Sequence, residues 1–258
     1  SAFGWALTFI PVWATISFGQ SEALSLLLLC LVYLLWRQER LWSAGLMCSI
    51  LLYKFPLLLG VVLLWLLEWK RDWRALAGLM LGGAVLAGLS LSLLPEASLA
   101  YVKSSGKMLS LIHAREFPLA NFFSMRGFWL MLLPGHSAWA DGLYIVCVGI
   151  TLLGFFRFLC GRHDDRDMAF AGAVCFTLLV TPYAFSYDCA ILLLQAILLW
   201  QKQIHGWREI FALVWLATFW SSILTTLQLS ESRFAVQISV PALVYAVIRV
   251  YATLERQT

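Results

Sequence analysis

Three short polar motifs interrupt an otherwise apolar chain, and each carries residue types that could bind or transform a ligand. They are FGQSE at 18–22, YKFP at 53–56 and TPYAFSYD at 181–188. Each contains Gly or Pro and places hydrogen-bonding or charged groups at the edge of a hydrophobic segment. Polar groups are costly beside hydrocarbon, so their presence there indicates a function.

Lys54 is the most informative of these residues because it precedes a proline. A residue before proline is disfavoured in helical geometry, so the helix is expected to break at this point. An ammonium group at such a break can bind a phosphate. The alternative is a lysine whose long stem reaches out to the lipid headgroups, and we favour the phosphate ligand.

Helix N-termini should add positive potential around this lysine. Segments that begin at 23, 57 and 187 are predicted to point their N-termini to the same face, each with about half a unit of positive charge. Ser21 and Ser186 are suited to cap two of these helices. The pattern predicts an anion site, and the natural anion at a membrane surface is a lipid phosphate or pyrophosphate.

The other polar residues of the motifs are candidates for substrate binding. Gln20 and Glu22 could hydrogen-bond sugar hydroxyls from a tight turn, or simply face solvent. Asp188 lies in the first turn of an apolar helix, where it could act as a base, pair with a basic residue or complement the helix dipole. Tyr183 and Tyr187 could contact substrate, although tyrosines at a membrane boundary are often only interfacial.

The segment 95–142 is the one long stretch between apolar segments. Its first half has apolar residues at helical spacing and is predicted to lie along the membrane interface. Its second half contributes Arg115, Asn121 and Arg126 as substrate-binding candidates. The two arginines could bind a substrate phosphate or lipid headgroups, and Asp141 is interpreted as an ordinary interfacial residue.

Composition indicates a polytopic membrane protein. Hydrophobic residues make up 62% of the 258 residues, only 12% are charged, and the mean hydropathy is +0.83. The formal charge of +4 is scattered over loops, so nucleic acid is not expected as a partner. Six cysteines stand singly and the histidines lack ligand spacing, so we expect buried free thiols and no metal or cofactor.

Ten apolar segments are expected to form transmembrane or half-spanning helices of an all-α fold, arranged as a single membrane-embedded domain over 1–258. Several are shorter than the ~20 residues that cross a bilayer unaided. The segments lie at 2–16, 23–36, 42–53, 57–67, 76–94, 143–159, 168–181, 187–200, 209–228 and 234–252.

Segments 42–53 and 57–67 could form one kinked span or a hairpin. Only the hairpin brings the basic loops to one side, together with most of the 18 Lys and Arg. That side is expected to be cytoplasmic, which places the three polar motifs and 95–142 outside. The loops on the basic side are 37–41, 68–74, 157–167 and 201–208. A belt of tryptophans is predicted at the cytoplasmic boundary, namely Trp36, Trp42, Trp65, Trp69, Trp73, Trp200 and Trp207.

Four stretches of the sequence, taken in order, carry a family resemblance. They are FGQSEALSLLLL, AGLMCSILLYKFPLLLGVVLLWLLEWKRDWRAL, the weaker NFFSMRG at 121–127, and TPYAFSYDCAILLL. In order and spacing they resemble glycosyltransferase family 87. These are membrane transferases of the GT-C class, and they include polyprenyl-phosphate-mannose-dependent mannosyltransferases. The resemblance covers most of residues 15–200.

The resemblance implies a multi-pass, GT-C-like fold in the inner membrane, with its active site on the extracytoplasmic face. It implies a cell-envelope enzyme that transfers a hexosyl or pentosyl group, with inversion, from a polyprenyl-phosphate sugar to a hydroxyl of a lipid or glycan acceptor. By this resemblance, Lys54 meets the donor phosphate, and Gln20 and the turn at 183–188 line the cavity. Membrane lipids are the remaining partners.

In GT-C enzymes the catalytic base is usually an Asp in the first extracytoplasmic loop, and here no Asp precedes Asp72. The resemblance therefore places the base upstream of Ser1, in an N-terminal catalytic part that we expect to be missing, with Asp188 or Glu22 as substitutes.

The alternative function is a secondary transporter or lipid-carrier flippase, which also uses broken helices with polar tips. A membrane scaffold without enzymatic activity is a third reading. The lack of an internal repeat and the grouping of polar motifs on one face favour the transferase.

Overall fold

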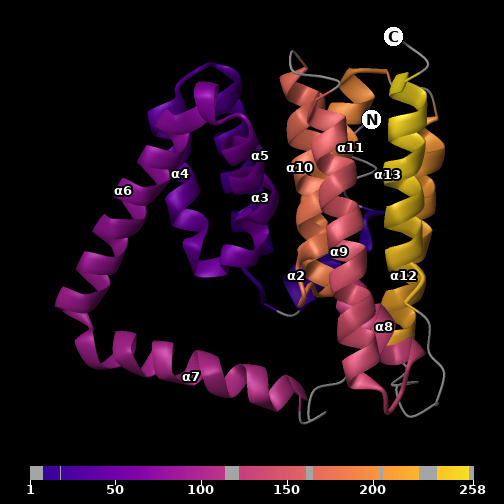
Figure 1. The fold of residues 1–258 in the computed structure, drawn as a ribbon, viewed down its shortest axis with the longest axis horizontal. Helices are drawn as coiled ribbons and strands as arrows, with labels where there is room; N and C mark the ends of the chain where they lie inside the picture. The colour runs from indigo at the N-terminus through magenta and orange to yellow at the C-terminus, as the bar shows by residue number, and fades with distance from the viewer. Residues whose placement is uncertain are drawn as a thin grey trace.

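The computed structural model describes residues 8–17, 19–113, 122–160, 165–203, 206–226 and 237–255. These residues form an all-helical protein, as predicted, and their one β-type pairing is an isolated bridge between Phe122 and Phe185 (Figure 1). The helices are α2 (Ile10–Ser17), α3 (Glu22–Arg37), α4 (Leu41–Ile50), the 3-10 helix η1 (Leu51–Leu58), α5 (Leu59–Leu67), α6 (Trp69–Leu93), α7 (Pro95–His113), α8 (Met125–Leu132), α9 (Ser137–Cys160), α10 (Arg166–Val180), the 3-10 helix η3 (Ser186–Ile191), α11 (Leu192–Gln201), α12 (Trp207–Thr226) and α13 (Ser239–Glu255).

Among the described residues, three helical stretches are long and apolar enough to cross a membrane, namely Leu41–Leu67, Trp69–Leu93 and Ser137–Cys160. The first of these is not one straight helix. Its backbone leaves helical geometry at Lys54, where φ is −134° and ψ is 58°. The break falls before Pro56, as expected for a residue that precedes proline.

The break at Lys54 turns the chain back on itself. Gly45 packs against Ala75 and, further along both helices, Ser49 packs against Gly82, so α4 and α6 run parallel. Because α5 joins α6 through a tight turn at Glu68, α5 must run antiparallel to α4, as Figure 1 shows. The hairpin that the charge pattern predicts is therefore confirmed.

The hairpin is short, and its turn is recessed. α4 has 10 residues and α5 has 9, whereas α6 has 25. At 1.5 Å per residue each arm reaches roughly 15 Å, about half of a ~30 Å hydrocarbon layer. η1 therefore lies deeper in the bundle than the far ends of α6 and α9 (Figure 1). Irregular backbone at such a depth is tolerated where it is buried in protein or lines a polar cavity.

α10 is the central helix, and nearly all of its side chains are buried. α5 approaches it closely because Gly60 has no side chain; a Cβ there would lie 1.9 Å from the carbonyl oxygen of Ala173. The Gly60 amide donates a 2.9 Å hydrogen bond to Thr177 Oγ1, whose hydroxyl in turn donates to the Ala173 carbonyl. This contact fixes the start of α5, and with it η1, against α10.

The sequence prediction is wrong about part of the basic side. The expected loop at 68–74 is helical from Trp69 onward, and Asp72 is fully buried in the first turn of α6, where it pairs with Arg71. Trp36 and Trp65 are fully buried rather than interfacial. The guanidinium groups of Arg71 and Arg166 lie 5.2 and 5.5 Å from the Trp36 ring, so this tryptophan forms cation–π contacts with two basic residues. The exposed tryptophans of the expected belt are Trp42, Trp69, Trp73 and Trp200.

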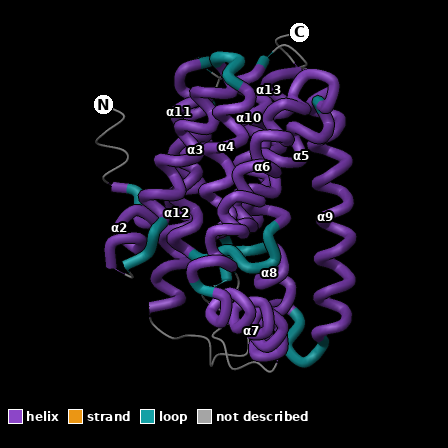
Figure 2. The backbone as a smooth tube through the Cα atoms, turned by 90° about the vertical axis from the view of Figure 1, so that its left-hand side faces the viewer, coloured by secondary structure: helices purple, strands orange, loops and turns teal. Residues whose placement is uncertain are grey.

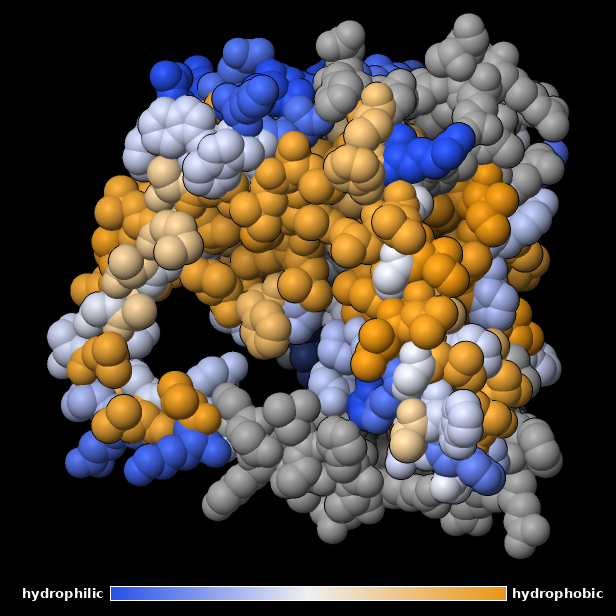
Figure 3. All heavy atoms as spheres, viewed as in Figure 1, coloured by the Kyte–Doolittle hydropathy of each residue, from blue (hydrophilic) through white to orange (hydrophobic). Residues whose placement is uncertain are grey.

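The segment 95–142 does contain helices outside the main bundle. α7 runs crosswise to α6 beneath the other helices in Figure 1, and Figure 2 shows it nearly end-on. α8 is capped by Ser124, whose Oγ accepts a hydrogen bond from the Gly127 amide. α9 begins already at Ser137, so the segment is shorter than predicted. In Figure 3 a hollow lies between the far part of α6, α7 and the rest of the molecule.

Candidate active site

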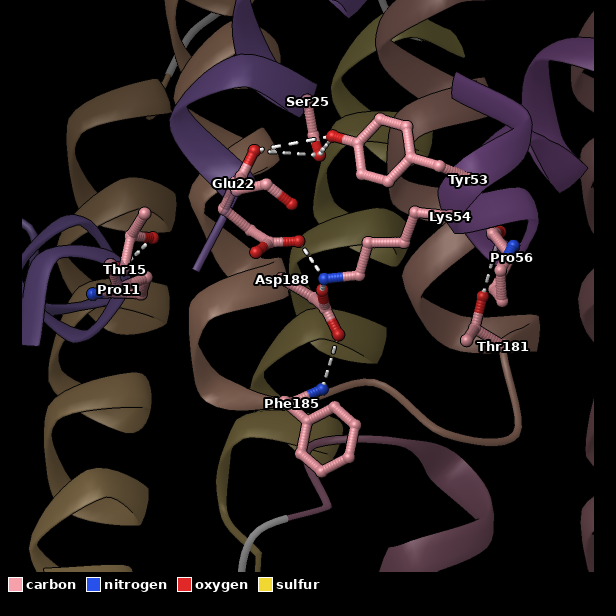
Figure 4. A network of polar contacts seen from close by, with 11 residues as sticks. Pro11, Thr15, Glu22, Ser25, Tyr53, Lys54, Pro56, Thr181, Phe185 and Asp188 are labelled. Atoms are coloured by element: carbon pink, nitrogen blue, oxygen red, sulfur yellow. Dashed lines mark hydrogen bonds and ion pairs between the residues drawn. The ribbon is translucent and has the colours of Figure 1, made fainter. Parts of the chain in front are cut away.

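Lys54 lies between two buried carboxylates at the recessed turn. Its Nζ forms an ion pair with Glu22 Oε1 and a second one, of 2.5 Å, with Asp188 Oδ1 (Figure 4). The side chains of Glu22 and Asp188 are 0% and 3% exposed, whereas that of Lys54 is 22% exposed. Lys54 is therefore the most accessible member of this ionic cluster.

Each member of the ionic cluster sits where a helix starts or breaks. Glu22 is the first residue of α3, Lys54 is the break inside η1, and Asp188 lies in the first turn of η3. The predicted helix caps are only partly correct. Ser21 is the N-cap residue of α3 but makes no side-chain cap hydrogen bond. η3 is capped at Phe185, whose amide donates a 2.7 Å hydrogen bond to Asp188 Oδ2.

Neutral hydrogen bonds hold the turn on both sides of Lys54. The hydroxyls of Tyr53 and Ser25 are 2.7 Å apart and join η1 to α3. On the other side, Thr181 Oγ1 donates a 3.2 Å hydrogen bond to the Pro56 carbonyl (Figure 4). Sequence reasoning missed both contacts, because hydroxyl residues at helix ends are too common to identify a partner.

The charges of the ionic cluster do not balance. Two carboxylates share one ammonium group, which gives the cluster a formal charge of −1 when all three groups are ionised. Asp188 uses both oxygens, one for Lys54 and one for the Phe185 amide. Within the described residues, Glu22 Oε2 is buried without a hydrogen-bond partner. The site is thus less positive than the anion site expected from the sequence, and an excess buried charge of this kind is costly.

Aromatic rings form one wall of the cluster. The Tyr187 ring lies 4.7 Å from Lys54 Nζ, within the range of a cation–π contact. Phe185 stacks on Tyr187, with ring centroids 5.2 Å apart, and packs on Phe122 at 5.4 Å. The Phe123 amide donates a 2.7 Å hydrogen bond to the Ala184 carbonyl, so the segment before α8 is fixed to the turn at 181–188.

Arg126 and Tyr183 belong to a second polar cluster, at α8 and α9. Arg126 Nε donates to Asp141 Oδ1 at 2.7 Å, and its Nη1 donates to the Tyr183 hydroxyl at 3.1 Å. The Arg126 side chain is buried, whereas Asp141 is one-third exposed. The interpretation of Asp141 as an ordinary interfacial residue is therefore wrong, since it is the main partner of a buried arginine.

The remaining candidates are less well placed or lie elsewhere. Gln20 is exposed in the turn before α3, next to Gly19, which has a φ of 60°. Arg115 and Asn121 lie outside the described residues.

No group of three or more His, Cys, Asp or Glu able to hold a metal occurs in the part of the chain that the structure describes. All six cysteines are free; Cys160 is exposed, and Cys30 and Cys147 are only partly buried, which corrects the expectation that all are buried.

The fold and the ionic cluster together define an all-helical membrane protein with a recessed polar site. The sequence model of glycosyltransferase family 87 matches residues 1–182, and the chain belongs to this family. It is therefore a member of a family of membrane glycosyltransferases. The match includes Glu22, Lys54 and Arg126 and ends just before Tyr183. Comparison with curated proteins and with solved structures finds no match.

Proposed function

We propose that this protein transfers a hexosyl or pentosyl group from a polyprenyl-phosphate sugar to a hydroxyl of a lipid or glycan acceptor. The reaction takes place on the extracytoplasmic face of the inner membrane, in a GT-C-like active site, and inverts the anomeric carbon. The observation that supports this most is the recessed Glu22–Lys54–Asp188 cluster, because a lipid-linked phosphate reaches such a site without leaving the membrane.

In this mechanism Lys54 binds the donor phosphate. Since Lys54 is the most accessible member of the cluster, an incoming phosphate oxygen can replace Glu22 as its partner while Asp188 keeps the lysine in place. The bond between the anomeric carbon and the phosphate oxygen then breaks, and the electron pair moves to the phosphate. A fixed positive charge at that oxygen stabilises the leaving group in a water-poor site.

The acceptor hydroxyl attacks the anomeric carbon from the opposite side and gives up its proton. Of the two carboxylates in the cluster, Glu22 is the better proton acceptor, because Asp188 is held by Lys54 and by the Phe185 amide. The loss of its lysine partner to the phosphate makes Glu22 more basic, which favours proton transfer. The competing candidates for the proton acceptor are an Asp before Ser1, which is expected from the resemblance, and Asp188.

The other candidates are assigned to substrate contacts. We place Tyr187 and Gln20 beside the sugar, where an aromatic ring and an amide suit a carbohydrate surface. We place Tyr183 and Arg126, together with Arg115 and Asn121, along the path of the phosphate and the acceptor. Family membership favours this function over the alternative of a secondary transporter or lipid-carrier flippase.

The test uses the full-length protein in proteoliposomes. Polyprenyl-phosphate sugars or nucleotide sugars are added from either side, and transfer to a lipid acceptor is measured. The proposal predicts transfer only from the polyprenyl-phosphate sugar, and only when the face that carries Lys54 can reach it. Equal transfer from a nucleotide sugar without a lipid carrier would contradict the proposed donor.

A further inference from the structure

An apolar cavity of about 360 Å³ lies between α9, α10, α11 and α13, away from the ionic cluster. Its walls are almost entirely aliphatic and aromatic, with Phe155, Phe158 and Phe176 among them. The volume falls within the range of ligand pockets, ~300–1,000 Å³. None of the residues of the proposed active site lines it, so the cavity is separate from that site.

The cavity follows α10 over most of that helix's length. Along α10 its lining residues run from Met168 to Leu179, which at 1.5 Å per residue is about 16 Å. An apolar cavity that extends this far along a membrane helix suits an extended hydrocarbon chain. Because α10 crosses the bundle, the cavity has the same direction as the lipid chains of the surrounding bilayer.

Glycine residues create the space. A Cβ built at Gly154 of α9 meets no atom within 4 Å, so the wall at this residue is open to the cavity. Gly172, on the facing helix α10, leaves room for Phe158 and Phe155; a Cβ there would lie 2.8 Å from the Phe158 ring. Larger residues at these two positions would fill the cavity or push its aromatic wall inward.

A positive charge marks one end of the cavity. Arg157 lies in the last turn of α9, lines the cavity and is exposed. The rest of the lining is apolar apart from Thr151, Cys175 and Gln195. This end belongs to the side of the bundle that carries the basic loops, and basic pockets between membrane helices on that side bind anionic lipid headgroups. An apolar cavity can bind an acyl chain, and the guanidinium of Arg157 at its end can bind the phosphate of the same anionic lipid.

We infer that the cavity holds one acyl chain of an anionic glycerophospholipid, with the lipid phosphate at Arg157. The site is independent of the proposed transfer reaction, and its Arg157 end lies at the opposite end of the bundle from Lys54. A bound lipid there fills the gap between α9 and the central helix α10, and so supports a long apolar helix that is otherwise little covered by protein (Figure 2).

Native mass spectrometry of the full-length protein, with phosphatidylglycerol or phosphatidylcholine added, tests the inference. The wild-type protein should retain phosphatidylglycerol in preference. Arg157→Gln should lower that preference about fivefold, since one basic residue contributes about 1 kcal/mol to anionic lipid binding. Gly154→Leu, which fills the cavity, should lower retention of phosphatidylglycerol about tenfold or more.

Gly149→Leu is the matched control, because Gly149 lies on the same helix in open space but does not line the cavity. It should retain the lipid like the wild type. Equal retention of phosphatidylglycerol and phosphatidylcholine by the wild type would overturn the inference, and so would unchanged retention by Gly154→Leu. If Gly154→Leu fails to fold, Arg157→Gln alone tests the inference. An unchanged preference of this variant for phosphatidylglycerol over phosphatidylcholine would then overturn it.

Discussion

Two ionic clusters tie α3 to the central part of the bundle, one at each end, and they are built differently. On the basic side, Asp167 accepts a 2.7 Å hydrogen bond from the Tyr33 hydroxyl and pairs with Arg37 and Lys202, both at 3.3 Å. The two cations are 51% and 36% exposed. At the other end, Lys54 is mostly buried between two buried carboxylates.

The difference supports the proposal that the cluster at Lys54 is functional, whereas the one at Asp167 is structural. At the basic end, burial alone would lower the pKa of Lys202, but the carboxylates of Asp165 and Asp167 raise it above its ordinary value. Its charge is therefore well matched and still solvated. At Lys54 the protein instead keeps a buried carboxylate oxygen of Glu22 without a partner within the described residues. Such an arrangement is costly for stability and is more readily explained by a ligand.

The largest effect should follow from Lys54→Met in the full-length protein. Without the ammonium, the donor phosphate has no counter-charge and the leaving group is no longer stabilised. Transfer should fall about 1,000-fold, at the upper end of what one electrostatic group contributes. Radiolabelled sugar transfer is measured on protein that elutes as a folded species, and activity within a few-fold of wild type would remove Lys54 from the mechanism.

Glu22→Gln should act on a different step. The amide can still hydrogen-bond to Lys54 but is a poor proton acceptor, so kcat should fall about 100-fold while the KM for the donor is unchanged or lower. The pH profile of kcat should lose its acidic limb. Asp188→Asn is the matched comparison; if it reproduces the kcat loss while Glu22→Gln does not, the proton acceptor is assigned to the wrong carboxylate.

Arg126→Gln tests the second polar cluster of the same end. It removes a charged hydrogen-bond partner of Asp141 and Tyr183, and we expect the free energy of unfolding to fall by about 2 kcal/mol. The melting temperature in detergent reports this loss. A normal melting temperature combined with a raised donor KM would instead show that Arg126 acts mainly on substrate.

Lys202→Met should have the smallest effect, because its ion pairs with Asp165 and Asp167 are partly exposed. Such pairs contribute at most about 1 kcal/mol, so stability should change little and sugar transfer should not change. This variant is the charge-matched control for Lys54→Met. A comparable loss of transfer in both variants would remove the distinction between the two clusters.

The sequence predicts the parts of this fold that depend on local pattern. The apolar segments, the hairpin and the break at Lys54 follow from hydropathy, charge sidedness and the proline that comes next. The pairing of Glu22 with Lys54 does not, since it depends on how α3 packs against a turn 32 residues further along the chain. The same is true of Trp36, a plausible interfacial residue in sequence that the fold buries under arginines from two other helices.

Binding of a polyprenyl phosphate to the full-length wild type, Lys54→Met and Glu22→Gln tests the central claim most directly, because it separates phosphate recognition from chemistry. If the phosphate replaces Glu22 on Lys54, Lys54→Met should bind about 50-fold more weakly, and Glu22→Gln should bind as tightly as the wild type or more tightly. Wild-type affinity in Lys54→Met, or an equal loss in both variants, would contradict the account.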